Sequence, residues 1–372
     1  MANPDITPIT MPKWGLSMQE GKVVQWLVSA GTAVNIGDQM LDIETEKIAN
    51  TFEALESGLL RRQVAQAEEV LPVGALLGVF APASVSDEAV DAFITEFQAS
   101  YVPPPPEEGD TGPAYQWADV GSYKLRYSKV GDSGPAVILI HGFGGDLGNW
   151  LFTQEPLAAQ AQVYALDLPG HGQSSKAITD ASVPGLANII IGFMAAISIS
   201  RAHLVGHSLG GAIALQAAIT APARVESLTL LAPAGLGSEI NASYLTGFIN
   251  GESRRDMKPI LQQLVASPDL ITRQLIDDIL KFKRTDGVPE ALWAIAAGFI
   301  TNDKQTVNLR AQLGALVAPT TIIWGKADKI IPVEHAGDLP SKIKVALLDK
   351  VGHLSHMEAS AQVNALLKDQ VK

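Results

Sequence analysis

A serine flanked by glycines is the residue of this chain best placed for covalent chemistry. The segment Gly206–Gly210 reads GHSLG and lies between an apolar run at 202–206 and an alanine-rich run that begins at Leu209. This order of strand, turn and helix is the setting of a nucleophile elbow, a sharp turn that presents a catalytic serine. Both glycines permit a turn too tight for side chains, so we expect Ser208 to adopt a strained backbone with its Oγ exposed. The pattern predicts a nucleophilic serine, followed by a helix whose first amides point at developing negative charge.

A serine hydroxyl needs a base and an orienting acid, and two later loops supply them. Asp328 follows the apolar run 320–324, and His353 follows the apolar run 345–349. Each is expected at the carboxyl end of a parallel strand, in the chain order serine, aspartate, histidine that is typical of this turn. His356 is the competing base, but it is expected to point along a helix. We therefore predict that Asp328 and His353 complete a triad with Ser208.

Donors for an oxyanion are predicted in an earlier loop. Residues 141–144, HGFG, follow the apolar run 136–140 and have the composition of the loop that completes an oxyanion hole. We predict the backbone amides of Phe143 and Leu209 as the donors. His141 itself is interpreted as structural.

Other polar residues are interpreted as structural or as surface. Asp167 and His171 belong to a DLPGHG turn after the next strand, where we expect them to hydrogen-bond loops. Arg254, Arg255 and Lys258 form a basic cluster that we interpret as solvated surface, with a site for the phosphates of coenzyme A as the alternative.

Lys47 is a second candidate for covalent chemistry. It lies in DIETEKIANTFEA between two strand-like runs, so its amine is expected at the tip of a hairpin, and Gly31 and Gly58 stand where tight turns need positive φ. At these residues the segment resembles the lipoyl domains of 2-oxo acid dehydrogenase complexes, through its opening MPKWGLSMQEG, its ETEKI tip and its closing SGLL. The resemblance implies lipoate in amide linkage to Lys47. A biotin carrier would have methionines where Glu46 and Ile48 stand.

The elements that position these residues predict a multidomain chain. Short β-type runs between glycine-centred turns over residues 4–82 predict a small all-β domain, a flattened barrel or sandwich. Residues 83–114 are predicted to be an acidic helix and a proline-rich linker, because VPPPPEEGDTGP cannot pack as a core. From 115 to 372, apolar strands alternating with helices predict a mostly parallel sheet covered on both faces. This alternation stops over about 237–313, which predicts an all-helical cap.

Composition narrows the function further. The absence of cysteine excludes disulfides, thiolate metal sites and a cysteine nucleophile, and we predict no metal. The net charge of −12 lies entirely in the first 110 residues, which disfavours nucleic acid and anionic membranes and favours a basic protein partner, with solubility alone as the alternative. The N-terminus lacks the features of a secretory signal, and the longest apolar stretch, about fourteen residues, is shorter than the roughly twenty that a membrane span needs. We therefore expect a cytoplasmic protein.

The motifs around Ser208, Asp328 and His353 resemble those of the α/β-hydrolase superfamily over roughly residues 115–372, a likeness that fixes fold and nucleophile but not reaction. A lipoyl domain followed by such a domain resembles, over the whole chain, the dihydrolipoamide acetyltransferase components of bacterial acetoin dehydrogenase complexes. The resemblance implies that an acetyl group passes from the Lys47 arm to coenzyme A, the co-substrate. It also implies two partners, a thiamin-diphosphate-dependent acetoin dehydrogenase component and a dihydrolipoamide dehydrogenase. We expect a homo-oligomer.

The sequence also departs from the usual acyltransferase component. It has no HxxxD stretch near the C-terminus and no basic, glycine-rich segment for binding peripheral subunits, so the way in which partners dock stays open. Two other functions also stay open. One is a thioesterase or carboxylesterase that carries a lipoyl domain, which would result if water reached the acyl-serine. The other is a non-catalytic lipoyl carrier or scaffold.

Overall fold

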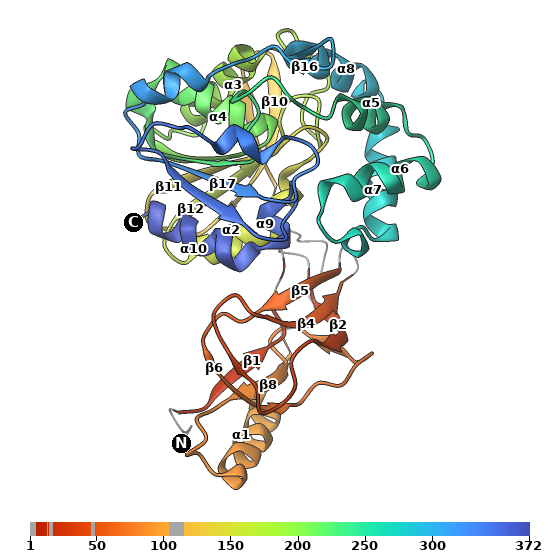
Figure 1. The fold of residues 1–372 in the computed structure, drawn as a ribbon, viewed down its shortest axis with the longest axis vertical. Helices are drawn as coiled ribbons and strands as arrows, with labels where there is room; N and C mark the ends of the chain where they lie inside the picture. Colours follow the sequence, from red (N-terminus) through yellow and green to blue (C-terminus); the bar gives the residue numbers. More distant parts are fainter. Residues whose placement is uncertain (1–4, 13, 15–17, 46–48, 104–114) are drawn as a thin grey trace. The chain divides into compact units, whose positions relative to one another are not determined.

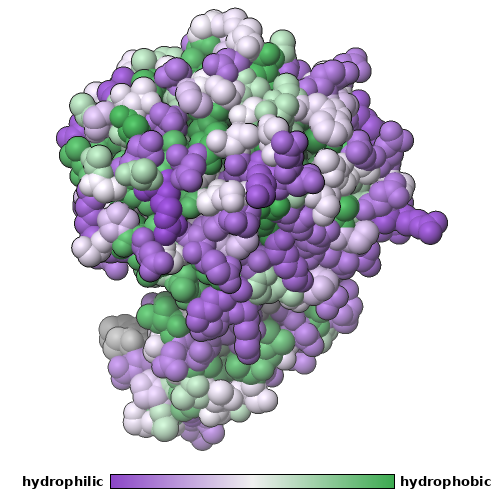
Figure 2. Space-filling view, turned by 45° about the horizontal axis from the view of Figure 1, so that its top comes forward, coloured by the Kyte–Doolittle hydropathy of each residue, from purple (hydrophilic) through white to green (hydrophobic). Residues whose placement is uncertain are grey.

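The computed structural model describes residues 5–12, 14, 18–45, 49–103 and 115–372. The chain divides into two compact units, Met1–Gly112 and Pro113–Lys372 (Figure 1). Each unit has hydrophobic clusters of its own. Hydrophilic and hydrophobic residues are interspersed over the face seen in Figure 2. Within the described ranges, no helix is long and apolar enough to cross a bilayer.

The first unit consists of two four-stranded antiparallel sheets with one core between them. The strand orders are β1-β8-β6-β3 and β5-β4-β2-β7. The strands are β1 (Thr7–Thr10), β2 (Glu20–Trp26), β3 (Ala33–Val34), β4 (Gln39–Glu44), β5 (Ala49–Glu53), β6 (Gly58–Gln63), β7 (Val70–Pro72) and β8 (Leu76–Phe80). Leu41, Leu60 and Leu77 are fully buried in the shared core. The predicted small all-β domain is confirmed, although the short strands β1, β3 and β7 were not predicted.

In the described part of this unit, one helix, α1 (Asp87–Ser100), packs against the strands. It begins after Ser86, whose hydroxyl accepts a hydrogen bond from the amide of Ala89. Val90 is fully buried in a cluster with residues of β8, and Arg61 forms an ion pair with Asp87. The acidic helix predicted next to the proline-rich segment therefore shares a small core with the strands before it.

The second unit is built on an eight-stranded sheet of order β18-β17-β14-β13-β11-β12-β10-β9. Its strands are β9 (Gln116–Val120), β10 (Tyr123–Val130), β11 (Ala136–Ile140), β12 (Gln162–Leu166), β13 (Ala202–His207), β14 (Val225–Leu231), β17 (Thr320–Gly325) and β18 (Lys344–Leu348). The six strands from β11 onward pair in parallel, whereas β10 pairs antiparallel with both β12 and β9. The predicted mostly parallel sheet is confirmed, and the antiparallel hairpin at its edge was not predicted.

Helices cover both faces of this sheet because its central strands are apolar on both sides. Ile138 and Ile140 belong to the cluster that includes α3 (Val183–Ala196) and α4 (Leu209–Thr220). Val137 and Leu139 belong to the cluster on the opposite face, which includes residues of α2 (Leu151–Ala158) and α10 (Ser360–Gln370) (Figure 1). Successive residues of one strand thus point to opposite layers.

The cap over the carboxyl ends of the strands is mostly helical. Its helices are α5 (Ala242–Asn250), α6 (Arg254–Leu261), α7 (Arg273–Lys283) and α8 (Val288–Phe299), with short 3-10 turns η3 (Gln262–Leu264) and η4 (Pro268–Leu270). The prediction of an all-helical cap is wrong at one point, where β15 (Ile300–Thr301) pairs antiparallel with β16 (Lys304–Gln305). Asn302 and Asp303 both have positive φ, 52° and 59°, and form the two-residue turn of this hairpin.

Candidate active site

Ser208 occupies a strained turn between β13 and α4. Its φ of 54° and ψ of −118° lie outside the regions that a serine normally adopts. The turn is possible only with glycine on both sides: a Cβ on Gly206 would lie 2.2 Å from the carbonyl oxygen of Gly210, and one on Gly210 would lie 2.3 Å from that of Ile140. The Ser208 amide donates to Leu231, which fixes the turn against the neighbouring strand.

His353 and Asp328 meet as the sequence predicts for a base and its orienting acid. The His353 Nδ1 atom lies 2.7 Å from Asp328 Oδ2, and both side chains are almost completely buried. Asp328 also accepts hydrogen bonds from the amides of Ile330 and Ile331 and from the Trp324 indole. These donors fix the carboxylate, so Nδ1 of the imidazole carries the proton and Nε2 remains available as a base.

Ser208 and His353 line one cavity of about 80 Å³ between the sheet and the cap. The glycine-rich loop 142–145 forms part of its wall. The cap contributes apolar side chains, namely Ile240, Tyr244, Leu245, Phe248, Leu261, Leu264, Leu275, Ile279 and Phe299. The volume is well below the roughly 300–1,000 Å³ of pockets for drug-sized ligands, so the cavity suits a small group.

Of the two predicted oxyanion donors, one lines this cavity and the other begins the adjoining helix. Leu209 is the first residue of α4, where an amide has no partner inside the helix. Phe143 lines the cavity, and its ring packs edge-on against Phe248. Their role as donors stays a prediction.

His356 is buried behind the catalytic loop. Its ring lies 4.6 Å from that of Trp150 and 4.7 Å from that of His207, and neither ring nitrogen has a hydrogen-bond partner in the described part of the chain. Burial lowers its pKa to about 3, so the ring is neutral. The contact with Asp328 belongs to His353 instead.

His207 supports the catalytic loop, a role that the sequence did not predict. Its Nε2 atom lies 3.0 Å from the backbone oxygen of His353, and its ring lines the cavity beside Ser208. Burial, reinforced by the neighbouring His353 and His356, lowers its pKa well below the ordinary value. A neutral ring can donate this one hydrogen bond and so fix the loop of the catalytic base. Its position next to the serine was the only available signal.

The polar residues interpreted as structural form a buried network. Asp167 pairs with Arg126 at 2.6 Å and accepts hydrogen bonds from the amides of Leu147 and Gln173. His141 Nε2 accepts from the Leu168 amide, and His171 Nε2 accepts from the Gly144 amide. This network holds the loop that contains Phe143.

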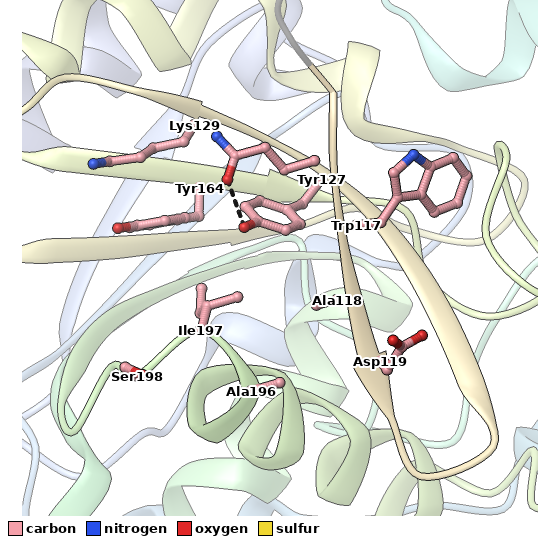
Figure 3. A pocket seen from close by; sticks show the side chains of 10 residues that line it. Trp117, Ala118, Asp119, Tyr127, Lys129, Tyr164, Ala196, Ile197 and Ser198 are labelled. Atoms are coloured by element: carbon pink, nitrogen blue, oxygen red, sulfur yellow. Dashed lines mark hydrogen bonds between the residues drawn. The ribbon is translucent and has the colours of Figure 1, made fainter.

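The basic cluster of the cap does not line the cavity. All three residues are exposed on α6, and Arg254 is paired with Asp277. A larger cleft of about 580 Å³ lies at the edge of the sheet, between β9, β10 and the end of α3 (Figure 3). Its lining includes Tyr127, Tyr164 and Lys129 but no histidine, so it offers no base of the kind that activates a serine.

Lys47 lies outside the described residues. The strands on either side of it, β4 and β5, pair antiparallel, with Glu44 opposite Ala49.

Comparisons with known proteins agree with this architecture. Residues 135–360 match the family described as alpha/beta hydrolase fold, and residues 7–80 match the family described as biotin-requiring enzyme. A meta-cleavage product hydrolase from Pseudomonas fluorescens aligns with a TM-score of 0.63 at 24% identity, over 68% of this chain and 96% of its own. The chain is thus an α/β-hydrolase-fold protein with an N-terminal domain of the biotin and lipoyl type.

Two relatives match nearly the whole chain. The dihydrolipoyllysine-residue acetyltransferase component of the acetoin cleaving system of Cupriavidus necator is 46% identical over 98% of this chain and 97% of its own length. The component with the same description from Pseudomonas putida is 47% identical over 96% of each. The chain therefore belongs to the family of dihydrolipoyllysine-residue acetyltransferase components of acetoin cleaving systems, as its motifs predicted, and it is an acyltransferase.

Proposed function

We propose that Ser208, His353 and Asp328 transfer an acetyl group from a thioester donor to coenzyme A. The observation that carries the proposal is the buried hydrogen bond between His353 and Asp328, with Ser208 in the same cavity as the imidazole. This arrangement is that of a serine nucleophile with an oriented base.

The reaction takes two similar halves. Ser208 Oγ attacks the thioester carbonyl while His353 Nε2 takes its proton, and the amides of Phe143 and Leu209 stabilise the oxyanion. His353 then protonates the leaving thiol, and an acetyl-serine remains. In the second half, the thiol of coenzyme A loses its proton to His353 and attacks the acetyl-serine, which releases the acetyl thioester and restores Ser208.

Lys47 is the proposed attachment point of lipoate. When bound in amide linkage, lipoate supplies a dithiol that carries the acyl group as a thioester. The match of residues 7–80 to a family of biotin and lipoyl type supports this, as do the paired strands β4 and β5 on either side of the lysine. A tethered donor reaches the serine at high effective concentration.

The cavity supports a short acyl group and the exclusion of water. Its volume of about 80 Å³ leaves little space for a long chain, and the cap lines it with apolar residues such as Phe248 and Leu261. Water competes with the thiol for the acetyl-serine, so a closed apolar cap favours transfer over hydrolysis.

The proposed reaction needs a carrier domain, a connection and a catalytic domain. The proposed boundaries are 4–82 for the lipoyl domain, 83–114 for the helix and linker, and 115–372 for the catalytic domain.

Because the relatives are components of acetoin cleaving systems, the proposed partners are a thiamin-diphosphate-dependent component and a dihydrolipoamide dehydrogenase. A homo-oligomer and a cytoplasmic location, where coenzyme A is available, complete the proposal.

The test compares lipoylated full-length protein with Ser208→Ala and Lys47→Arg variants, each supplied with acetoin and the dehydrogenase component. Acetyl-coenzyme A and free acetate are measured. We expect Ser208→Ala to lose acetyl-coenzyme A formation by roughly a thousandfold or more. Lys47→Arg should form none, yet its Ser208 should still react with a fluorophosphonate probe. Full activity of Ser208→Ala would overturn the triad mechanism, and acetate as the main product would assign a hydrolase.

A further inference from the structure

Glu358 links the cap to the loop that holds the catalytic histidine. It is the last residue of α9 (Ser355–Glu358). Its Oε2 atom accepts a hydrogen bond of 2.7 Å from the amide of Ala266, which lies in the cap between η3 and η4. Its Oε1 atom accepts one of 2.9 Å from the amide of Gly352, the residue directly before His353. One carboxylate therefore connects two segments that are about ninety residues apart in sequence.

The backbones of the two segments also touch directly. The carbonyl oxygen of Leu264 accepts hydrogen bonds from the amides of His353 and Leu354, at 2.8 and 3.2 Å. A Cβ on Gly352 would lie 2.8 Å from the amide nitrogen of Ala266, so only glycine permits this approach. The position of the catalytic loop and the position of the cap are thus set by the same contact.

We propose that Glu358 is a positioning residue that clamps the cap onto the catalytic loop and thereby keeps water away from the acetyl-serine. This inference rests on the proposed function, because it concerns the fate of an acetyl group on Ser208. Thiolysis of that ester forms the acetyl thioester and returns a proton to Ser208. Hydrolysis adds water across the same bond, and the products are acetate and free Ser208.

The clamp is strongest with the ionised carboxylate, because both of its oxygens are then full acceptors, whereas protonation turns one of them into a donor and a weaker acceptor. Burial raises the pKa of Glu358 to about 7, against the opposite effect of its two backbone donors. Two titratable groups face it: Asp328 raises the pKa further, and His353 lowers it. As the pH falls from about 8 to about 6, the carboxyl gains a proton and one of the two amides is left with the weaker acceptor. The proposal therefore predicts more hydrolysis at lower pH.

Ionisation of Glu358 is expected to strengthen the clamp but to lower the stability of the fold. This difference separates the clamp from a merely structural role. A carboxyl whose pKa is raised in the folded state binds more protons there than in the unfolded chain, so stability decreases as the pH rises from the ordinary value of 4.5 to about 7, and the loss is complete above that. Glu358→Gln, which is neutral like the protonated carboxyl and keeps one acceptor oxygen, should therefore not lower the unfolding temperature at pH 8. A variant that hydrolyses more of its acetyl-serine without being less stable would show that the carboxylate acts on the site.

The experiment uses the full chain with Glu358→Gln, Glu358→Ala and, as a matched control, Glu334→Gln, which changes an exposed glutamate. p-Nitrophenyl acetate loads Ser208, and the burst of p-nitrophenol measures this acylation independently of the clamp. Coenzyme A is then added, and the ratio of acetate to acetyl-coenzyme A is measured between pH 6 and 8. Wild type and the control are compared with the two Glu358 variants at each pH, so the common titration of the thiol cancels.

We expect roughly a tenfold higher ratio of acetate to acetyl-coenzyme A for both Glu358 variants at pH 8, and a smaller difference from wild type at pH 6. A normal burst with an unchanged ratio in Glu358→Gln would overturn the clamp while leaving the triad intact. A missing burst in wild type would overturn the proposed function itself. A changed ratio in Glu334→Gln would show that the effect is not specific, and it would also contradict the proposal.

Discussion

Among the described residues, both units have ion pairs at the surface, but only the second unit also has buried ones. In the first unit, Arg61 and Arg62 pair with Asp87 and Asp91 at the surface, with the aspartates more than half exposed. In the second, the pairs Arg126–Asp167 and His353–Asp328 lie in the interior. A carrier requires only that its fold present a lysine, whereas a serine nucleophile requires a base and an acid held at fixed distances. Buried pairs provide that fixed geometry, and they are sensitive to the loss of one partner.

The largest effect is expected from Asp328→Asn. The amide cannot stabilise the imidazolium or hold the productive tautomer, so acetyl transfer should fall by roughly ten thousandfold in kcat. Burst kinetics with p-nitrophenyl acetate measure the loss, and urea unfolding serves as the control for folding. A loss of less than about tenfold would mean that the buried acid is not part of the catalytic machinery.

Asp167→Asn should affect stability more than chemistry. It leaves the guanidinium of Arg126 buried without a counter-charge, which costs about 3–5 kcal/mol of the free energy of unfolding. Urea titration followed by tryptophan fluorescence measures the change, and the resistance of the first unit to proteolysis within the full-length variant should be unchanged. If the second unit kept its wild-type stability, the contrast between buried and exposed pairs would not hold.

Val90→Ala makes the corresponding change in the core of the first unit. The side chain is fully buried between α1 and the sheet, so its truncation should reduce the stability of that unit by about 2 kcal/mol. Hydrogen exchange of the α1 amides reports the loss. Labelling of Ser208 by a fluorophosphonate should not change, and a slower labelling rate would indicate coupling that the contacts within each unit do not predict.

The smallest effect is expected from Asp87→Ala. Exposed ion pairs are screened by salt and contribute little, so the unfolding temperature should shift less than in Val90→Ala, and the shift should shrink further at high ionic strength. Thermal unfolding at two salt concentrations measures it. A salt-independent loss larger than that of Val90→Ala would show that surface pairs hold α1 in place.

The features that the sequence predicted are those with local signals. The elbow around Ser208 depends on two glycines and on a strand and a helix that are adjacent in sequence, and Asp328 and His353 each follow a recognisable apolar run. The parallel strands were predictable because burial on both faces makes them continuously apolar. The two-residue strand β3 is too short to show any pattern.

Other features depend on contacts between distant segments and left no local signal. Glu358 looks like an ordinary glutamate at the end of a short helix, and only the folded chain brings Ala266 to its carboxylate. His207 acts through the carbonyl of a residue 146 positions later. The hairpin in the cap was missed because the surrounding helical pattern outweighed the turn at Asn302 and Asp303.

The backbone conformation of Ser208 has a consequence for how this family can change. At φ 54° a glycine would have less backbone strain than any residue with a side chain. The stability of the fold alone therefore favours Ser208→Gly. Selection for acyl transfer is then what retains the hydroxyl at this position. A descendant that kept only the carrier role would be free to gain thermal stability by exchanging this one residue, and a glycine at the elbow would mark such a lineage.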